Sequence, residues 1–479
     1  MKTKIAAACL LLSVSIPSAF AQQETPPPPA PPREAAIPKP AEKTLANGLR
    51  IVVVQKKGLP LVAARLAVKT GAEADPADLA GLADTTASLL TKGTATRSAE
   101  QIARGVEALG ATIESAASWD FSYVAMSALA SNFDQAARYL ADVVRRPTFK
   151  ADELERLREQ NLDALQVALR QPNTLANMVA MRVIFGAAPY GHNLGGTPES
   201  LERITRTDVV AFHRTYYRPD NAVLVIAGDI QPAAGFALAE KLLGGWAKPS
   251  APIPVRKADE AKAPAPRVVV VDMPDAGQAA VLVARQGIRR ADPAYSVAQV
   301  ANSILGGGYS ARLNQEIRIR RGLSYGATST FDFRRDPGPF TAGAQTKNES
   351  AAEVAGILVD ELNRMAKTPV AESEMTPRKA VLLGSFARSL ETTGGLVARF
   401  ANLAVYGLHL TEISRYLSAI QGVTAEQVQA FAAERLGGGT MSVVIVGDAK
   451  KFLEPLRQRF ENVDVIPLAK LRLDSPSLR

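Results

Sequence analysis

The stretch GLADTTASLLTKGT, residues 81–94, has the pattern of an amphipathic helix with one face on which chemistry could be placed. Its apolar residues recur at helical spacing, which predicts that one side packs against a core. Asp84, Ala87 and Ser88 share a neighbouring face, because residues three and four apart are adjacent on a helix. A zinc-binding helix uses this geometry, with two histidines four positions apart and a glutamate between them. Here only Asp84 is a potential ligand, and one carboxylate cannot hold zinc.

The other potential metal ligands of the chain do not complete such a site. The three histidines, His192, His213 and His409, are not at ligand spacing, so we interpret each as a surface or structural residue. The only cysteine, Cys9, lies in an N-terminal apolar run. The mature protein would therefore have no disulfide and no thiolate zinc site. The sequence predicts no catalytic metal site in this chain.

The N-terminus has the pattern of a secretory signal peptide, residues 1–21. A short positive region and an apolar run over residues 5–16 precede small residues at Ala19 and Ala21. A lipoprotein signal at Cys9 is disfavoured because hardly any apolar run precedes it. The apolar run is too short to remain as a membrane anchor. Export without disulfides suits a bacterial periplasm, which is the location we predict.

Composition is ordinary for a soluble globular protein. The chain has 479 residues, more than one core comfortably accommodates, with 47% hydrophobic and 22% charged residues. The net charge of +9 is spread along the chain. No basic run is interleaved with aromatic residues, so we expect no nucleic-acid partner.

Two proline-rich stretches divide the chain. Residues 22–41 form an extended tether, and residues 248–266 form a linker. They leave an N-terminal domain at 42–247 and a C-terminal domain at 267–479. Each half is predicted to be an α+β domain, with a sheet covered mainly on one face by helices.

The halves have the pattern of two copies of one unit. Each opens with a β-branched apolar run, at 49–55 and at 267–273. Near its end each has a second such run, at 221–230 and at 441–450, and both stop at a Gly-Asp pair. The two glycines are 219 residues apart (447 − 228), as a duplicated domain would give.

The helix around Asp84 resembles the metal-binding helix of the insulinase/pitrilysin superfamily of zinc peptidases, whose pattern is H-x-x-E-H. The resemblance extends over residues 42–468. In such proteins the helix reads Gly-Leu-Ala-His-x-x-Glu-His and is followed by Lys-Gly-Thr. This chain keeps the flanking Gly-Leu-Ala and Lys-Gly-Thr. The two histidines of the family correspond here to Asp84 and Ser88, and the glutamate that polarises the bound water corresponds to Ala87. A further glutamate ligand downstream in the family corresponds to Ala164, with Asp163 beside it.

Two other stretches, 216–230 and 301–329, resemble the signatures of the two family domains. In the second signature an arginine and a tyrosine seven residues apart hold the substrate backbone and support charge on the attacked carbonyl. The matching residues are Arg318 and Tyr325. Spacing alone would make Arg318 a solvated helix cation and Tyr325 a half-buried strand aromatic. The surrounding motif favours the functional interpretation.

The resemblance implies two homologous domains that form half of a clam shell. Some members divide the work between chains, one with H-x-x-E-H and one with the arginine and tyrosine. This chain fits the second role. It would be inactive alone, hold no cofactor, and pair with a zinc-bearing homologous subunit that hydrolyses unfolded peptides. The alternative is a catalytically inert peptide-binding or scaffold protein of the same fold.

Three local patterns admit other interpretations. GLSYG, residues 322–326, matches a nucleophile elbow around Ser324, but the elbow needs a strand before the serine and a helix after it, and here the predicted order is reversed. LGGGYS, residues 305–310, is no phosphate loop, because no Gly-Lys-Ser/Thr follows, and it is predicted to end a helix. The glycine pair within 391–408 is either a loop or a plain helix start.

Overall fold

The computed structural model describes residues 37–254 and 264–479. The predicted signal peptide at 1–21, most of the tether and the middle of the linker lie outside the described residues. Ile37, which the sequence places in the tether, packs against the core of the N-terminal half. In the described part of the chain, no helix is both long and apolar enough to cross a membrane.

The N-terminal half contains a six-stranded mixed sheet. Its spatial order is β1 (Ala41–Thr44), β2 (Arg50–Gln55), β6 (Ala222–Gly228), β3 (Leu61–Val68), β5 (Ser122–Leu129) and β4 (Thr112–Ala117). Strands β2 and β6 run parallel, and the other pairs are antiparallel. All seven residues of β6 are buried, because helices cover both faces of the sheet there.

The C-terminal half repeats this sheet. Its order is β12 (Val463–Pro467), β7 (Val268–Asp272), β11 (Ser442–Gly447), β8 (Ala279–Gln286), β10 (Pro339–Thr346) and β9 (Ala327–Phe331). The five strands from β7 to β9 match β2, β6, β3, β5 and β4 in order, and only the edge strand differs, since β12 is parallel to its neighbour. The prediction of two homologous α+β domains is confirmed.

One face of each sheet is covered by helices of its own half. The N-terminal core contains side chains of helices α1 (Leu82–Leu89), α2 (Ala99–Glu107), α3 (Phe133–Arg145), α4 (Ala151–Leu169), α6 (Pro198–Arg203), α7 (Arg206–Tyr216) and α8 (Pro232–Leu243). The C-terminal core contains side chains of α9 (Tyr295–Leu305), α10 (Arg312–Asn314), α11 (Ala351–Lys367), α15 (Ala425–Arg435) and α16 (Leu453–Arg459). The helices α12 (Glu372–Ser389) and α14 (Glu412–Gln421) also belong to this half.

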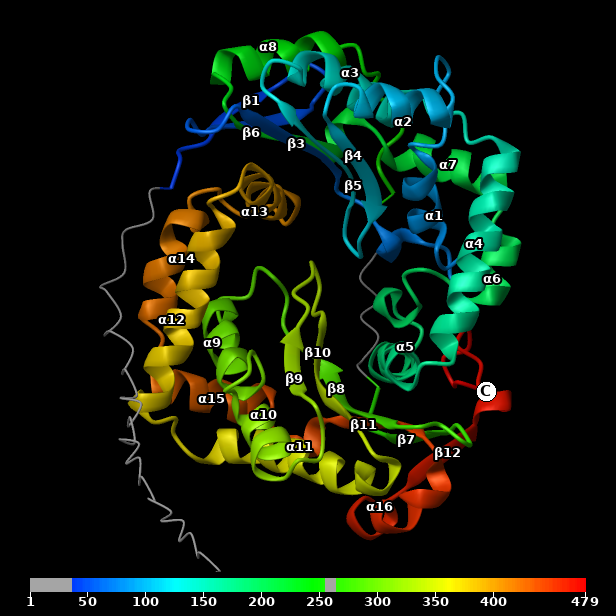
Figure 1. The fold of residues 1–479 in the computed structure, drawn as a ribbon, viewed down its shortest axis with the longest axis vertical. Coiled ribbons are helices and arrows are strands. Elements are labelled where there is room, and N and C mark those ends of the chain that lie inside the picture. The colour runs from blue at the N-terminus through cyan, green and yellow to red at the C-terminus, as the bar shows by residue number, and fades with distance from the viewer. Residues whose placement is uncertain (1–36, 255–263) are drawn as a thin grey trace, which may run out of the picture. The chain divides into compact units, whose positions relative to one another are not determined.

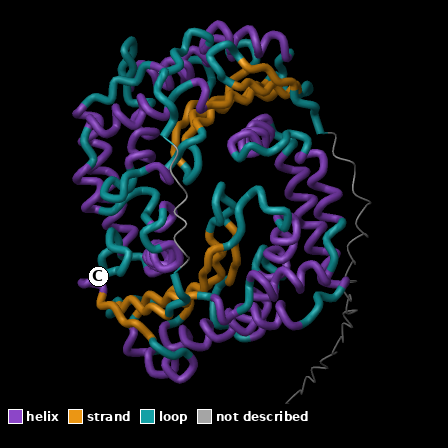
Figure 2. The backbone as a smooth tube through the Cα atoms, turned by 180° about the vertical axis from the view of Figure 1, so that it is seen from behind, coloured by secondary structure: helices purple, strands orange, loops and turns teal. Residues whose placement is uncertain are grey.

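The second face of each sheet is covered by a helix from the other half (Figure 1). Helix α13 (Thr393–Val405) packs on the N-terminal sheet, where Phe400 lies in one cluster with Val52 and Val225. Helix α5 (Pro172–Phe185) packs in the same way on the C-terminal sheet. Figure 2 shows the two sheets as separate bands of strands. The prediction that helices cover mainly one face of each sheet thus holds for the helices of the same half. The other face is buried because each half contributes one helix, α5 or α13, to the sheet of the other half.

A buried carboxylate links segments from both halves. Asp120, in the turn between β4 and β5, is fully buried. It accepts hydrogen bonds from the hydroxyls of Tyr190 and Tyr406 and, at 2.8 Å, from the backbone N–H of Arg335. The Arg335 side chain forms an ion pair with Glu73 at 3.1 Å. We call these five residues the Asp120 junction.

Candidate functional site

Helix α1, whose face lacks the expected ligands, is held at its N-terminus by a buried aspartate. The Asp75 carboxylate accepts hydrogen bonds from the backbone N–H groups of Gly81 and Ala83, both at 2.9 Å. Negative charge at this end is favourable because the N–H groups of the first turn have no partner within the helix. Sequence reasoning missed Asp75, since its position six residues before Gly81 matches no usual capping spacing.

The side chains at the metal-ligand positions do not form a donor set. Asp84 and Ser88 are half-buried, and Ala87 is fully buried. Burial, with the charge of Asp75 as the second cause, raises the pKa of Asp84 to about 6. On α4, Ala164 and its neighbour Asp163 are both exposed.

These residues do not fit a catalytic zinc ion. Such a site needs three protein ligands around the metal, and here serine and alanine occupy two of the three ligand positions, 88 and 164, which leaves Asp84. Across residues 37–254 and 264–479, no group of three or more histidine, cysteine, aspartate or glutamate side chains is arranged to hold a metal ion. The helix keeps its packing but not the donors.

The three histidines lie in structural or surface positions. His213 Nε2 lies 2.9 Å from the backbone carbonyl oxygen of Val144, and burial lowers the pKa of this imidazole to about 4. His192 is buried, with Nε2 3.5 Å from a carboxylate oxygen of Asp75. His409 is exposed. Their interpretation as surface or structural residues is confirmed.

The structure brings the predicted pair Arg318 and Tyr325 together. The guanidinium carbon of Arg318 lies 4.6 Å from the ring centroid of Tyr325 and 4.8 Å from that of Tyr309. Tyr325 immediately precedes β9 and is 88% exposed, and Tyr309 is 63% exposed. Tyr325 is therefore not a half-buried strand aromatic. We call Tyr309, Arg318 and Tyr325 the arginine stack.

Tyr309 is a member of the stack that sequence reasoning missed. It follows three glycines, and α9 ends at Leu305 with Gly306 as its C-cap, as the LGGGYS pattern predicts. The tyrosine thus stands on the loop after the helix, where its ring reaches Arg318. The sequence did contain a signal for this position. An aromatic residue directly after a run of glycines does not belong to the apolar stripe of a helix, so it need not face the core.

Arg318 differs from the arginines around it in having no acidic partner. Arg320 and Arg321 both form ion pairs with Glu316. Among the described residues, Arg318 makes no ion pair, and its contacts are the two rings. It lies in a π-helical segment, Gln315–Arg320, a rare conformation that is frequent at functional sites. Its N–H groups are therefore available to an external acceptor.

The stack contributes little to folding. A cation–π contact at an exposed site stabilises by about 0.5–1 kcal/mol. Two large aromatic rings held in water gain almost nothing from burial. The arrangement is thus better explained by what it presents to solvent than by the stability of the core.

The remaining motifs are resolved by their surroundings. Ser324 Oγ donates to the carbonyl oxygen of Gly326 at 2.8 Å, and the segment runs from a helical turn into β9. That order is the reverse of a nucleophile elbow. The glycine pair at 394–395 lies in the first turn of α13, where Thr392 accepts a hydrogen bond from the N–H of Gly395. It is a plain helix start.

Comparison with known proteins gives two family models that match in order along the chain. The model described as insulinase (peptidase family M16) matches residues 50–197, and the model described as peptidase M16 inactive domain matches residues 203–382. The second model matches the later part of the chain, after α1. The absence of ligands discussed above concerns α1, which the first model covers.

Relatives of similar length carry names that refer to zinc proteolysis. An uncharacterized zinc protease of Mycobacterium tuberculosis (strain ATCC 25618 / H37Rv) is 29% identical over 415 residues, covering 86% of this chain and 94% of the relative. One of Streptomyces coelicolor is 26% identical over 414 residues, covering 85% and 89%.

Solved structures share the fold over nearly their whole length. A peptidase M16 inactive domain from Pseudomonas fluorescens superposes with a TM-score of 0.79 at 28% identity, covering 85% of this chain and 98% of that one. A protease from Helicobacter pylori has a TM-score of 0.81 at 20% identity, covering 86% and 99%, and shows the fold alone. With both family models matched in sequence order and the duplicated sheet in common, this chain belongs to the insulinase (M16) peptidase family.

Proposed function

We propose that this chain is the zinc-less subunit of a periplasmic peptidase heterodimer. It contributes Arg318 and Tyr325 to the active site of a zinc-bearing homologous partner, which hydrolyses unfolded peptides. The observation that carries the proposal is the arginine stack, a half-buried arginine that contacts two exposed tyrosine rings and has no acidic partner among the described residues. Helix α1 of the same chain has no set of metal donors, so the stack has no metal centre of its own to serve.

The chemistry of the stack suits a developing oxyanion. A guanidinium presents several N–H donors in one plane, and a phenol adds an O–H donor. Tyr309 and Tyr325 pack against the Arg318 guanidinium, and contacts to aromatic rings do not use its N–H groups as hydrogen bonds to a carbonyl oxygen of the substrate would. Loss of one donor of this kind costs about 10²–10³ in rate.

The test is reconstitution with a zinc-bearing homologue from the same source. We expect the purified chain alone to show no chelator-sensitive cleavage of an internally quenched peptide, and the mixture to cleave it. Tyr325→Phe should lower the kcat of the mixture by about 10²-fold. Tyr139→Phe is the matched control, because Tyr139 also packs under an arginine, with the Arg97 guanidinium 4.7 Å from its ring centroid. Full activity of the Tyr325→Phe mixture would refute the assigned role.

The loss of the metal donors also supports a second candidate, a catalytically inert peptide-binding or scaffold protein. A scaffold needs no donor at position 325. In that case the mixture would form without any gain of peptidase activity over the zinc-bearing chain, and Tyr325→Phe would change neither assembly nor cleavage.

A further inference from the structure

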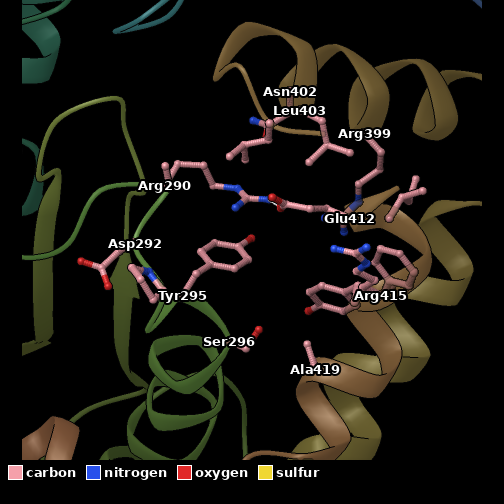
Figure 3. A pocket seen from close by; sticks show the side chains of 16 residues that line it. Arg290, Asp292, Tyr295, Ser296, Arg399, Asn402, Leu403, Glu412, Arg415 and Ala419 are labelled. Atoms are coloured by element: carbon pink, nitrogen blue, oxygen red, sulfur yellow. Dashed lines mark ion pairs between the residues drawn. The ribbon is translucent and has the colours of Figure 1, made fainter. Parts of the chain in front are cut away.

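A cavity of about 290 Å³ lies between α12, α13, α14 and the segment that leads into α9. It contains none of the residues of the arginine stack. Three arginines line it: Arg290 before α9, Arg399 on α13 and Arg415 on α14. In Figure 3 the three side chains come from different elements and approach the same space.

Positive charge on the walls of this cavity exceeds negative charge. Of the two acidic residues in the described lining, only Glu412 forms an ion pair with one of the arginines. Its Oε2 lies 3.5 Å from Arg290 Nη2, which is beyond close hydrogen-bonding distance. Asp292 Oδ1 accepts from the backbone N–H of Ala294, and its carboxylate points away from the arginines in Figure 3.

Within the described part of the chain, the two other guanidinium groups, those of Arg399 and Arg415, have no carboxylate partner. Arg399 donates to Ser389 Oγ at 3.1 Å and lies over the Phe386 ring, with 5.2 Å from the guanidinium carbon to the centroid. Arg415 forms no ion pair with any described residue. Three cations therefore face one anion. Because the positive charges repel one another in a partly enclosed space, the binding of an anionic group there is favourable.

The rest of the lining is apolar and aromatic. The residues concerned are Tyr295, Phe386, Leu403, Leu408, Ile413 and Tyr416. The Tyr416 hydroxyl donates to Gln299 Oε1 at 3.1 Å, and burial raises the pKa of Tyr416 to about 12, so the phenol stays neutral. The cavity thus combines a cationic end with an apolar wall, at the small end of the ~300–1,000 Å³ range of ligand sites.

We propose that this cavity binds a carboxylate joined to an apolar side chain, such as the free C-terminal residue of a peptide. Arginine forks match a carboxylate in a bidentate manner, and the apolar wall takes the side chain beside it. The volume suits a single amino-acid unit better than a longer segment. The inference goes beyond the function proposed above, because it needs neither the arginine stack nor a partner chain.

The test compares matched ligands on the full chain by isothermal titration calorimetry. The ligands are N-acetyl-L-phenylalanine, its amide, and a pentapeptide ending in phenylalanine as either the free acid or the amide. We expect both acids to bind and both amides to bind at least tenfold more weakly, because the amides lack the charge that strengthens hydrogen bonds from a guanidinium. If only the small acid binds, the source is a free metabolite; if the peptide acid binds as well, the cavity accepts a chain terminus.

Arg415→Gln is the main variant, because Arg415 is exposed and should be replaceable without loss of folding. It should weaken acid binding about tenfold, whereas Arg415→Lys should retain part of it. Arg388→Gln on α12 is the matched control, an exposed arginine that donates to Ser385 Oγ outside the cavity and should leave binding unchanged. Equal binding of acid and amide, an unchanged affinity in Arg415→Gln, or displacement of the acid by inorganic phosphate at lower concentration would each overturn the proposal.

Discussion

The Asp120 junction offers a sharp test of how the halves are held together. Asp120→Asn keeps the volume of the side chain but removes its charge and replaces one acceptor oxygen with an N–H donor. The hydroxyls of Tyr190 and Tyr406 and the backbone N–H of Arg335 all donate to this carboxylate in a fully buried site. The asparagine oxygen can still accept from part of this set, and the remaining donors are left facing an NH₂ group.

The magnitude follows from the number of donors that lose their acceptor. Each buried polar group left unsatisfied costs about 1–3 kcal/mol, and removal of one partner of a buried charged network costs about 3–5 kcal/mol. If the amide oxygen replaces Oδ2, the Tyr190 hydroxyl loses its acceptor, and if it replaces Oδ1, the Tyr406 hydroxyl and the Arg335 N–H lose theirs. One or two donors are therefore stranded, and the charge of the network is lost in addition. We expect the free energy of unfolding to fall by about 3–5 kcal/mol.

The assay is urea denaturation followed by tryptophan fluorescence, since Trp119 directly precedes Asp120. Asp360→Asn is the matched control, because it breaks an ion pair with Arg459 in which Asp360 is 62% exposed. That change should cost less than about 1 kcal/mol. A double-mutant cycle of Asp120→Asn with Tyr406→Phe should show a coupling of about 0.5–3 kcal/mol. A loss below about 1 kcal/mol in Asp120→Asn would refute the reasoning, because it would mean that the donors find other acceptors.

Three further predictions concern single positions. Burial raises the pKa of Glu73 from its ordinary value of 4.5 to about 7, so the folded state binds this proton more tightly than the unfolded state. The contribution of Glu73 to stability is complete below about pH 4.5 and is lost as pH rises to about 7. Glu73→Gln should flatten that dependence in urea midpoints measured from about pH 4.5 to 7.5, and an unchanged slope would contradict the raised pKa. Gly228→Ala would place a Cβ 2.1 Å from a backbone carbonyl oxygen of β3, so the thermal midpoint should fall. The fall should be much larger than in Gly58→Ala, where φ is also positive but the Cβ would meet nothing within 4 Å. Equal shifts would mean that backbone strain, and not the steric clash, causes the loss of stability. Tyr309→Ala should change the free energy of unfolding by less than about 1 kcal/mol, since Tyr309 is 63% exposed. The kcat of the reconstituted mixture should fall, because the Arg318 guanidinium loses one of the two rings that it contacts. A fall in stability without a change in kcat would show that the role of Tyr309 is structural.

Strands and their duplication could be predicted from the sequence because they depend on local patterns. The β-branched runs at 49–55 and 221–230 became β2 and β6, and their counterparts became β7 and β11. Both Gly-Asp pairs begin at the last residue of a strand. At the first pair the glycine is required, because Gly228 has a φ of +135° and its Cα faces the backbone of β3. A repeated local pattern can be recognised in the sequence alone, and the fold class follows from it.

The exchange of α5 and α13 could not be predicted in this way. Each helix has an apolar surface that needs a sheet, but its sequence does not say which of two similar sheets it will cover. The choice depends on the path of the connections and on contacts between distant segments, such as those that Asp120 makes with Tyr406 and Arg335. Contacts of this range carry no periodic signal in the sequence.

The sequence by itself determined that the metal ligands are missing, because serine at position 88 and alanine at position 164 leave Asp84 as the single carboxylate among the three ligand positions, wherever the helices lie. The resemblance of residues 301–329 to the second family signature also named Arg318 and Tyr325. Only the tertiary structure decided that these two side chains touch, that Tyr309 completes the stack, and that Asp75 caps α1. The physical reason is that the identity of a side chain sets the chemistry it can perform, whereas its neighbours, and therefore its role, are set by packing between segments far apart in the chain.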